Sequence, residues 1–246
     1  MATPAIVFKG VTLDFNGNVL FDDLSFTIDR ADCTCLLGPS GCGKSTILKL
    51  VSGDPSLSYT GTINCEGKKT ASGRTAWMAQ QDLLLPWLDV LANVLLGAKL
   101  RGEVSRELED KGRKLLAHAG LGTSVHAYPA TLSGGMRQRV ALLRTLMENR
   151  SILLMDEPFS ALDALTRIRL QNLSAQLTVG ATVLLVTHDP LEALRMANRI
   201  LVLEGSPVRI AADIRLQGIP PREAGDPEIA DNYSGLLELL MGGKAA

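Results

Sequence analysis

The chain has 246 residues, of which 25 are basic and 26 acidic, so its formal net charge is −1. This balance offers no basic field to a nucleic acid backbone and argues against DNA or RNA as the main partner. No apolar stretch approaches the roughly 18 residues of a membrane span, and residues 1–10 lack the features of a secretory signal. We therefore expect a protein of the cytosol.

The first part of the chain predicts an antiparallel layer. Residues 5–30 alternate apolar and polar side chains and contain Asn16-Gly17, a typical hairpin turn. Residues 61–66 predict a further strand of the same layer. Between them, the apolar run 33–37 predicts a buried strand, and residues 46–51 predict a helix that ends near Gly53.

A glycine-rich loop joins that strand to that helix. It fits the phosphate-binding pattern G-x-x-x-x-G-K-[ST] and comprises Gly38, Pro39, Ser40, Gly41, Cys42, Gly43, Lys44, Ser45 and Thr46. Successive backbone N–H groups of such a loop point at one phosphate, and the helix N-terminus that follows favours the anion. Lys44 adds a charge that can reach the β- and γ-phosphates, and Ser45 offers a hydroxyl to Mg²⁺.

The rest of the chain alternates helices with buried strands. Residues 88–120 show helical periodicity, and the continuous apolar runs 151–155 and 181–186 are typical of strands covered on both faces, with a helix at 167–176 between them. Short strand-like pieces follow residue 205, and 228–240 predict a last helix. We expect one α/β domain over 1–246, with a helical lobe at about 86–149 inserted in the core and a C-terminal extension at about 205–246.

Two further motifs carry chemistry. Asp156 and Glu157 end a buried strand: the first can hold Mg²⁺, and the second can orient or deprotonate a water. Residues 132–138 read Leu-Ser-Gly-Gly-Met-Arg-Gln and begin a helix to about Met147, with Ser133 as a good N-cap. Alone, that pattern would indicate a capped helix without a ligand, but two glycines before a helix also form an anion-binding terminus.

In this order, the motifs make the chain resemble the ATP-binding subunit of an ATP-binding cassette (ABC) transporter over essentially its full length. The resemblance rests on the phosphate loop, Gln80, the signature Leu132–Gly135, the Asp156-Glu157 strand end, the turn from Ser160 to Asp163 and His188. It implies the core of a P-loop NTPase with an antiparallel β layer and a helical signature lobe. Met136 replaces a frequent glutamine, as it often does in import cassettes.

The resemblance also implies a mechanism. Two copies of the chain would meet head to tail, and the ATP on the loop of one copy would be covered by the other copy's Ser133, Gly134, Gly135 and Asp163. Phe15 would stack on adenine, Glu157 would polarise the attacking water, and His188 would contact the γ-phosphate. Mg²⁺ would be bound by Ser45, Gln80 and Asp156.

Residues 80–87 read Gln-Gln-Asp-Leu-Leu-Leu-Pro-Trp and look like the corresponding segment of importers for nitrate, sulfonate, taurine or thiamine precursors. An apolar surface that receives a transmembrane permease would be formed by Leu83, Leu84, Leu85, Pro86 and Trp87. The other possibility is that these side chains fill the core of the lobe.

The resemblance thus implies a peripheral protein on the cytoplasmic face of the inner membrane, served by an extracytoplasmic solute-binding protein through the permease. Export, or extraction of lipids or lipoproteins, stays open as an alternative to import. A soluble ABC protein of repair or translation is a third possibility, although the chain lacks the second cassette, the coiled-coil insertion or the basic surfaces that such proteins usually need.

Overall fold

The computed structural model describes residues 4–15, 17–68, 71, 73–223 and 225–241. The chain forms two compact units, each of which is described by itself. Unit 1 comprises residues 1–75, 151–156 and 179–246, and unit 2 comprises residues 76–150 and 157–178. No helix in the described part of the chain is long and apolar enough to cross a membrane.

The antiparallel layer of unit 1 is the predicted hairpin with one added strand. Strands β1 (Pro4–Phe15) and β2 (Asn18–Asp29) pair antiparallel, and β4 (Tyr59–Cys65) pairs with the other edge of β1. Asn16 of the expected turn lies outside the described residues, but the register closes the hairpin with Phe15 opposite Asn18. The sequence prediction of an antiparallel layer is therefore confirmed.

The second sheet of unit 1 is mainly parallel. Strands β6 (Ile152–Asp156), β7 (Thr182–Thr187), β3 (Cys33–Leu37) and β8 (Arg199–Glu204) lie side by side in that order, and β9 (Arg209–Arg215) pairs antiparallel with β8. Every residue of β6 and β7 is buried. Their unbroken apolar sequence therefore reflects cover on both faces of the sheet.

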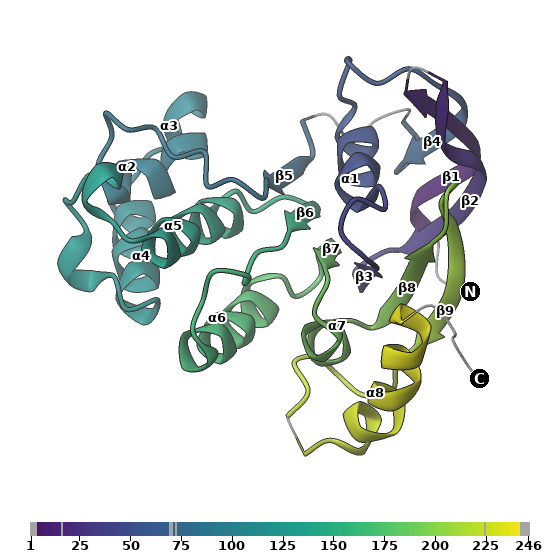
Figure 1. Ribbon diagram of the computed structural model, residues 1–246. Coiled ribbons are helices and arrows are strands. Elements are labelled where there is room, and N and C mark those ends of the chain that lie inside the picture. The colour runs from purple at the N-terminus through teal and green to yellow at the C-terminus, as the bar shows by residue number, and fades with distance from the viewer. Residues whose placement is uncertain (1–3, 16, 69–70, 72, 224, 242–246) are drawn as a thin grey trace. The chain divides into compact units, whose positions relative to one another are not determined.

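Helix α1 (Lys44–Ser52) connects the two sheets in one core (Figure 1). Its side chains Ile47, Leu48 and Val51 are almost fully buried in a cluster that includes residues of both sheets. Phe8 and Phe26 stack in the antiparallel layer, with ring centroids 4.4 Å apart. The core thus fixes α1 against the sheets, and with it the loop that precedes α1.

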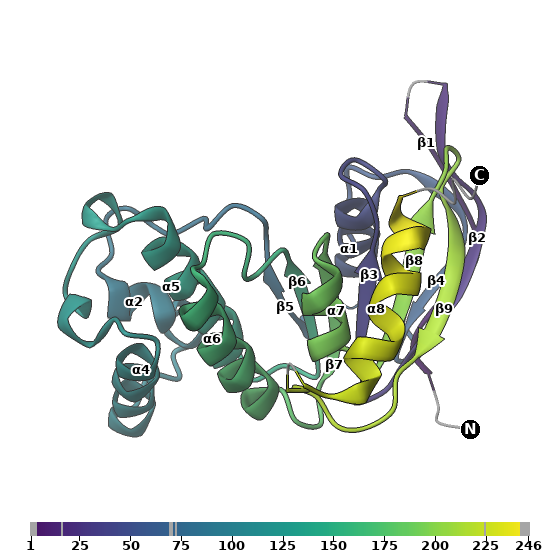
Figure 2. The same ribbon diagram turned by 60° about the horizontal axis from the view of Figure 1, so that its bottom comes forward.

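The C-terminal part of unit 1 packs on its parallel sheet. Helix α7 (Pro190–Met196) and helix α8 (Pro227–Leu240) lie side by side, as Figure 2 shows. The guanidinium group of Arg222, which is only 2% exposed, donates hydrogen bonds to the carbonyls of Leu194 and Ala197 at the end of α7. The extension after residue 205 is therefore an integral part of this unit.

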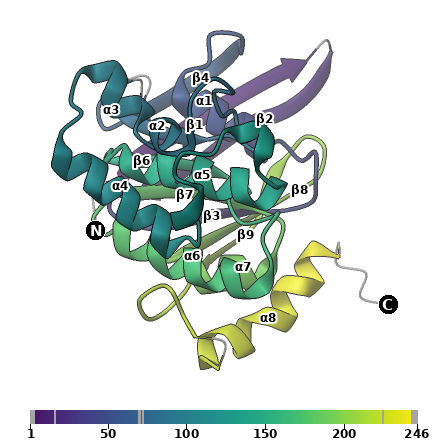
Figure 3. The same ribbon diagram turned by 90° about the vertical axis from the view of Figure 1, so that its left-hand side faces the viewer.

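Unit 2 is mostly helical. Strand β5 (Thr75–Met78) leads into it, and α2 (Val90–Val94), α4 (Arg106–His118) and α5 (Gly134–Met147) pack on one another (Figure 3). Helix α3 (Leu96–Arg101) follows α2, two short 3₁₀ turns (Gly122–Ser124 and Pro129–Thr131) precede α5, and α6 (Ala164–Leu177) completes the unit. The helical region expected at 88–120 is therefore three helices, because Gly102 ends α3 in the left-handed conformation and Ser105 caps a new helix.

Candidate functional site: a phosphate-binding loop and a signature helix

The glycine-rich loop of unit 1 has the backbone shape that phosphate binding requires. It leaves β3 and enters α1 through Gly43, which has a φ of 85° and serves as N-cap without any side-chain hydrogen bond to the helix. Left-handed backbone of this kind strongly favours glycine. The first N–H groups of α1 therefore have no side-chain cap, and they form the positive end of a helix dipole.

Lys44 lies within this loop. Its Nζ donates hydrogen bonds to the carbonyl oxygens of Gly38 (2.8 Å) and Pro39 (2.7 Å) and lies 3.8 Å from the Sγ of Cys42. Lys44 is 6% exposed and Cys42 8%, so both side chains are held in place by the loop. A single ammonium group held by backbone carbonyls, beside the N–H groups at the start of a helix, is suited to binding a polyphosphate.

Four other candidate residues stand at or directly after strand ends. Asp156 ends β6 and is 4% exposed, while His188 follows the last residue of β7, in the same unit. Asp189, the next residue, caps α7 by accepting hydrogen bonds from the N–H groups of Leu191 and Glu192. Glu157 has a φ of 49°, a conformation that is strained for a residue with a side chain. Phe15 is the last residue of β1 and is 45% exposed.

The residues present in unit 1 suit ATP with Mg²⁺. The Ser45 hydroxyl and the Asp156 carboxylate are hard oxygen donors, which Mg²⁺ prefers, and Mg²⁺ usually completes its shell with phosphate oxygens and water. The described residues contain no group of three or more His, Cys, Asp or Glu side chains that could hold a metal by themselves.

The signature in unit 2 is built as its sequence predicts. Ser133 is the N-cap of α5, and its hydroxyl accepts a hydrogen bond from the N–H of Met136. At Gly135 an added Cβ would lie 2.9 Å from the carbonyl oxygen of Ala161. The second signature glycine therefore also allows α5 to approach the turn at Ser160 to Asp163 closely. Asp163 in turn caps α6 through the N–H of Thr166.

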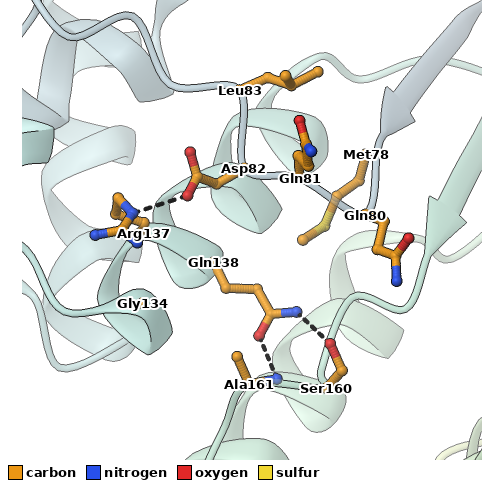
Figure 4. Close-up of a pocket in the computed structure, with 10 residues that line it drawn as sticks. All are labelled: Met78, Gln80, Gln81, Asp82, Leu83, Gly134, Arg137, Gln138, Ser160 and Ala161. Atoms are coloured by element: carbon orange, nitrogen blue, oxygen red, sulfur yellow. Dashed lines mark hydrogen bonds and ion pairs between the residues drawn. The ribbon is translucent and has the colours of Figure 1, made fainter.

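A cavity of about 440 Å³ lies beside the signature helix in unit 2 (Figure 4). Residues from three segments line it: Met78, Gln80, Gln81, Asp82, Leu83, Gly134, Arg137, Gln138, Ser160 and Ala161. Arg137 of α5 pairs with Asp82 (Nε to Oδ2 2.9 Å) and also donates to the carbonyl of Leu132. Gln80 lines the cavity but lies outside unit 1, which carries the phosphate loop.

The segment after Gln80 is exposed only in part. Leu83 is 58% exposed and Trp87 71%, whereas Leu84 is buried and Leu85 is half-buried. Pro86 is exposed. Trp87 is therefore not a core residue of the lobe, and Leu84 belongs to the interior rather than to the surface that the sequence suggested.

Polar side chains outside the sequence motifs hold this segment in shape. Asn93 of α2 is fully buried; its Oδ1 accepts the N–H of Leu85, and its Nδ2 donates to the carbonyls of Leu85, Leu88 and Asp89 at 2.8–3.1 Å. Arg144 of α5 donates to the carbonyls of Asp82 and Leu83. Burial lowers the pKa of this guanidinium below its ordinary value. In the sequence, the signal of such a support is a polar residue at a core-facing position of an apolar helix.

Fold and loop together define an α/β ATPase of the phosphate-loop class, and the comparisons with known proteins agree. Residues 21–160 match the family model described as ABC transporter. An uncharacterised ABC transporter ATP-binding protein of Haemophilus influenzae is 42% identical over 95% of this chain and 98% of its own length. The aliphatic sulfonates import ATP-binding protein SsuB 2 of Streptomyces avermitilis is 40% identical over 98% of this chain and 92% of its own length.

Solved structures show the same cassette. The dimeric structure of the bacterial ABC transporter cassette MJ0796 matches with a TM-score of 0.77 and 30% identity, over 87% of this chain and all of that one. A second dimeric structure of that cassette, in a post-hydrolysis state with ADP and Pi, matches with a TM-score of 0.77 and 29% identity over the same shares. The chain belongs to the family of ATP-binding proteins of ABC transporters. It is accordingly an ATP-hydrolysing subunit of an ABC transporter.

Proposed function

We propose that this chain is the ATPase of an importer for a small solute, with aliphatic sulfonates first among the candidates and nitrate, taurine or a thiamine precursor next. Several relatives at 36–40% identity are named aliphatic sulfonates import ATP-binding proteins, which supports import over export. The segment from Gln80 to Trp87 supports the same group. A solute-binding protein outside the membrane would deliver the solute, and the ATPase would lie on the cytoplasmic face.

The observation that carries the ATPase proposal is the start of α1, which has no side-chain cap and whose first residue, Lys44, is held by carbonyls of the loop. The loop from Gly38 to Thr46 would hold the ATP phosphates, and Ser45, Asp156 and Gln80 would hold Mg²⁺. When bound, Mg²⁺ neutralises charge on the β- and γ-phosphates. Glu157 would accept a proton from the attacking water, and His188 would contact the γ-phosphate.

Dimerisation would bring together two sets of nucleotide-binding groups, the phosphate loop of one copy and the signature residues of the other. Ser133, Gly134, Gly135 and Asp163 would cover an ATP held by the loop of a second copy, so that each site needs two chains. Loss of the γ-phosphate would remove a bridge between the copies. The permease would contact the exposed apolar side chains of Leu83, Pro86 and Trp87. Trp87 would be the main anchor, because large aromatic residues frequently carry the binding energy of interfaces.

The test uses Glu157→Gln in the full chain. It keeps a carbonyl acceptor but removes the base, so hydrolysis should fall by about 100-fold or more, and Mg·ATP should shift the protein to a dimer. Phosphate release and light scattering after size exclusion measure the two effects. Hydrolysis at the wild-type rate would reject Glu157 as the base. In reconstituted complexes, stimulation by a receptor loaded with an alkanesulfonate, but not with nitrate, would identify the solute class.

A further inference from the structure

The carbonyl of Glu157 lies at the centre of a small hydrogen-bond network in unit 2. Its oxygen accepts from the Nε2 of Gln138 at 2.9 Å and from the Oγ of Ser160 at 3.1 Å. The Nε2 of Gln138 also lies 3.1 Å from that hydroxyl. On its other side, the Oε1 of Gln138 accepts the N–H of Ala161 at 2.8 Å. Gln138 therefore holds both ends of the turn from Glu157 to Ala161, as Figure 4 shows for Ser160 and Ala161.

This turn contains a strained residue. Glu157 has a left-handed φ of 49°, which persists in a residue with a side chain only where the surroundings determine it. Gln138 is 7% exposed, and the close approach that Gly135 permits keeps α5 against the same turn. A buried amide with both polar atoms engaged, on a helix that packs directly on the turn, is such a determinant.

From these contacts we infer that Gln138 is a positioning residue for Glu157, and that it acts through the backbone of the glutamate. The inference rests on the proposed role of Glu157 as the base. The direction of the carboxylate depends on the φ and ψ of its own residue. A base that is misplaced by about 1 Å can lose 100-fold in rate. Gln138 thereby ties the position of the proposed base to the same helix that carries the signature.

The variant Gln138→Met keeps the length of the side chain and removes its hydrogen bonds to the turn. It should lower kcat by about 10- to 100-fold at unchanged KM for ATP, because the nucleotide contacts proposed for unit 1 are not altered. Gln176→Met is the matched control, since this glutamine is exposed on α6 of the same unit. It should keep the wild-type kcat.

Two combinations separate positioning from general loss of structure. Ser160 is exposed and donates to the same carbonyl, so Ser160→Ala should lower kcat by less than Gln138→Met, and the double variant should fall short of the product of the two effects. In a Glu157→Gln background, Gln138→Met should cause no further loss, because there is no base left to position.

The experiment measures steady-state Mg·ATP hydrolysis and thermal melting on the full-length variants. If Gln138→Met melts too low to assay, Ser160→Ala alone and in the Glu157→Gln background gives the same comparison. A wild-type kcat for Gln138→Met, or an equal further loss in the Glu157→Gln background, would overturn the inference. Wild-type hydrolysis by Glu157→Gln itself would instead reject the proposed base, which is a separate outcome.

Discussion

Asn93→Leu should destabilise the chain more than Trp87→Ala, which removes a large exposed side chain from the same segment. Leucine has the same branched shape as asparagine, but it would remove the four side-chain hydrogen bonds that Asn93 makes to one N–H and three carbonyls of residues 85–89. Each such hydrogen bond contributes about 0.5–1.5 kcal/mol net. Because the segment lies at the surface and water can replace part of the network, we expect the lower part of the range, about 2–3 kcal/mol in total.

For a chain of this size, 1 kcal/mol corresponds to about 2–4 °C in melting temperature, so Asn93→Leu should lower Tm by about 4–12 °C. Trp87→Ala is the control within the same segment. It removes far more side-chain surface, but this surface is already 71% exposed, so its effect should stay within about 0.5 kcal/mol.

Melting followed by circular dichroism, with and without Mg·ATP, measures both variants. If Asn93→Leu melts within about 1 °C of the wild type, the asparagine does not hold the segment. If Trp87→Ala shows the larger loss, Trp87 stabilises the lobe itself, and a loss of permease binding in this variant could not be assigned to docking. With Trp87→Ala folded, its failure to co-purify with the permease would support the docking role.

Two further predictions concern unit 1. Lys44→Ala should abolish tight binding of a fluorescent ATP analogue while the protein stays folded, because it removes the cation of the phosphate loop; unchanged affinity would reject that role. Arg199 makes two hydrogen bonds to Asp213, at 2.7 and 2.6 Å, and thereby lowers the pKa of that carboxyl. The stabilisation is therefore present above the unfolded-state pKa of about 4 and lost as the pH falls below it. The Tm difference between wild type and Asp213→Asn should accordingly be clear at pH 7 and shrink in acid. A Tm difference independent of pH would contradict this account.

The nucleotide loop could be predicted from sequence because its function depends on backbone shape. Glycine at a left-handed position, a lysine, and a helix start after a buried strand are all visible in the residues themselves, and β3 and α1 lie where the pattern places them. The buried strands β6 and β7 could also be predicted from sequence, because short continuous apolar runs in an alternating α/β chain are typical of strands covered on both faces. In these regions the local sequence and the tertiary structure agree.

The polar supports could not be predicted in the same way, because their partners are distant in sequence. Gln138 bonds to residues about 20 positions away, and Arg144 reaches back about 60 positions to Asp82 and Leu83. No spacing rule encodes such contacts. Sequence alone could only indicate that Gln138 shares a helix face with the buried residues Ala141 and Leu142, where a polar side chain requires a partner.

Gln138 and Arg144 lie on the same helix, α5, and each binds a strained turn beside the cavity. Leu83, with a φ of 46°, and Glu157, with a φ of 49°, are both left-handed residues that carry side chains. Arg144 of α5 binds the carbonyl of the first, and Gln138 of α5 binds the carbonyl of the second. The exposed leucine that we assign to the permease and the glutamate that we assign to hydrolysis are thus held by one helix, whose first turn also carries the signature. Because packed elements shift as units rather than deform continuously, a displacement of α5 on contact with a second copy would reach both turns at once.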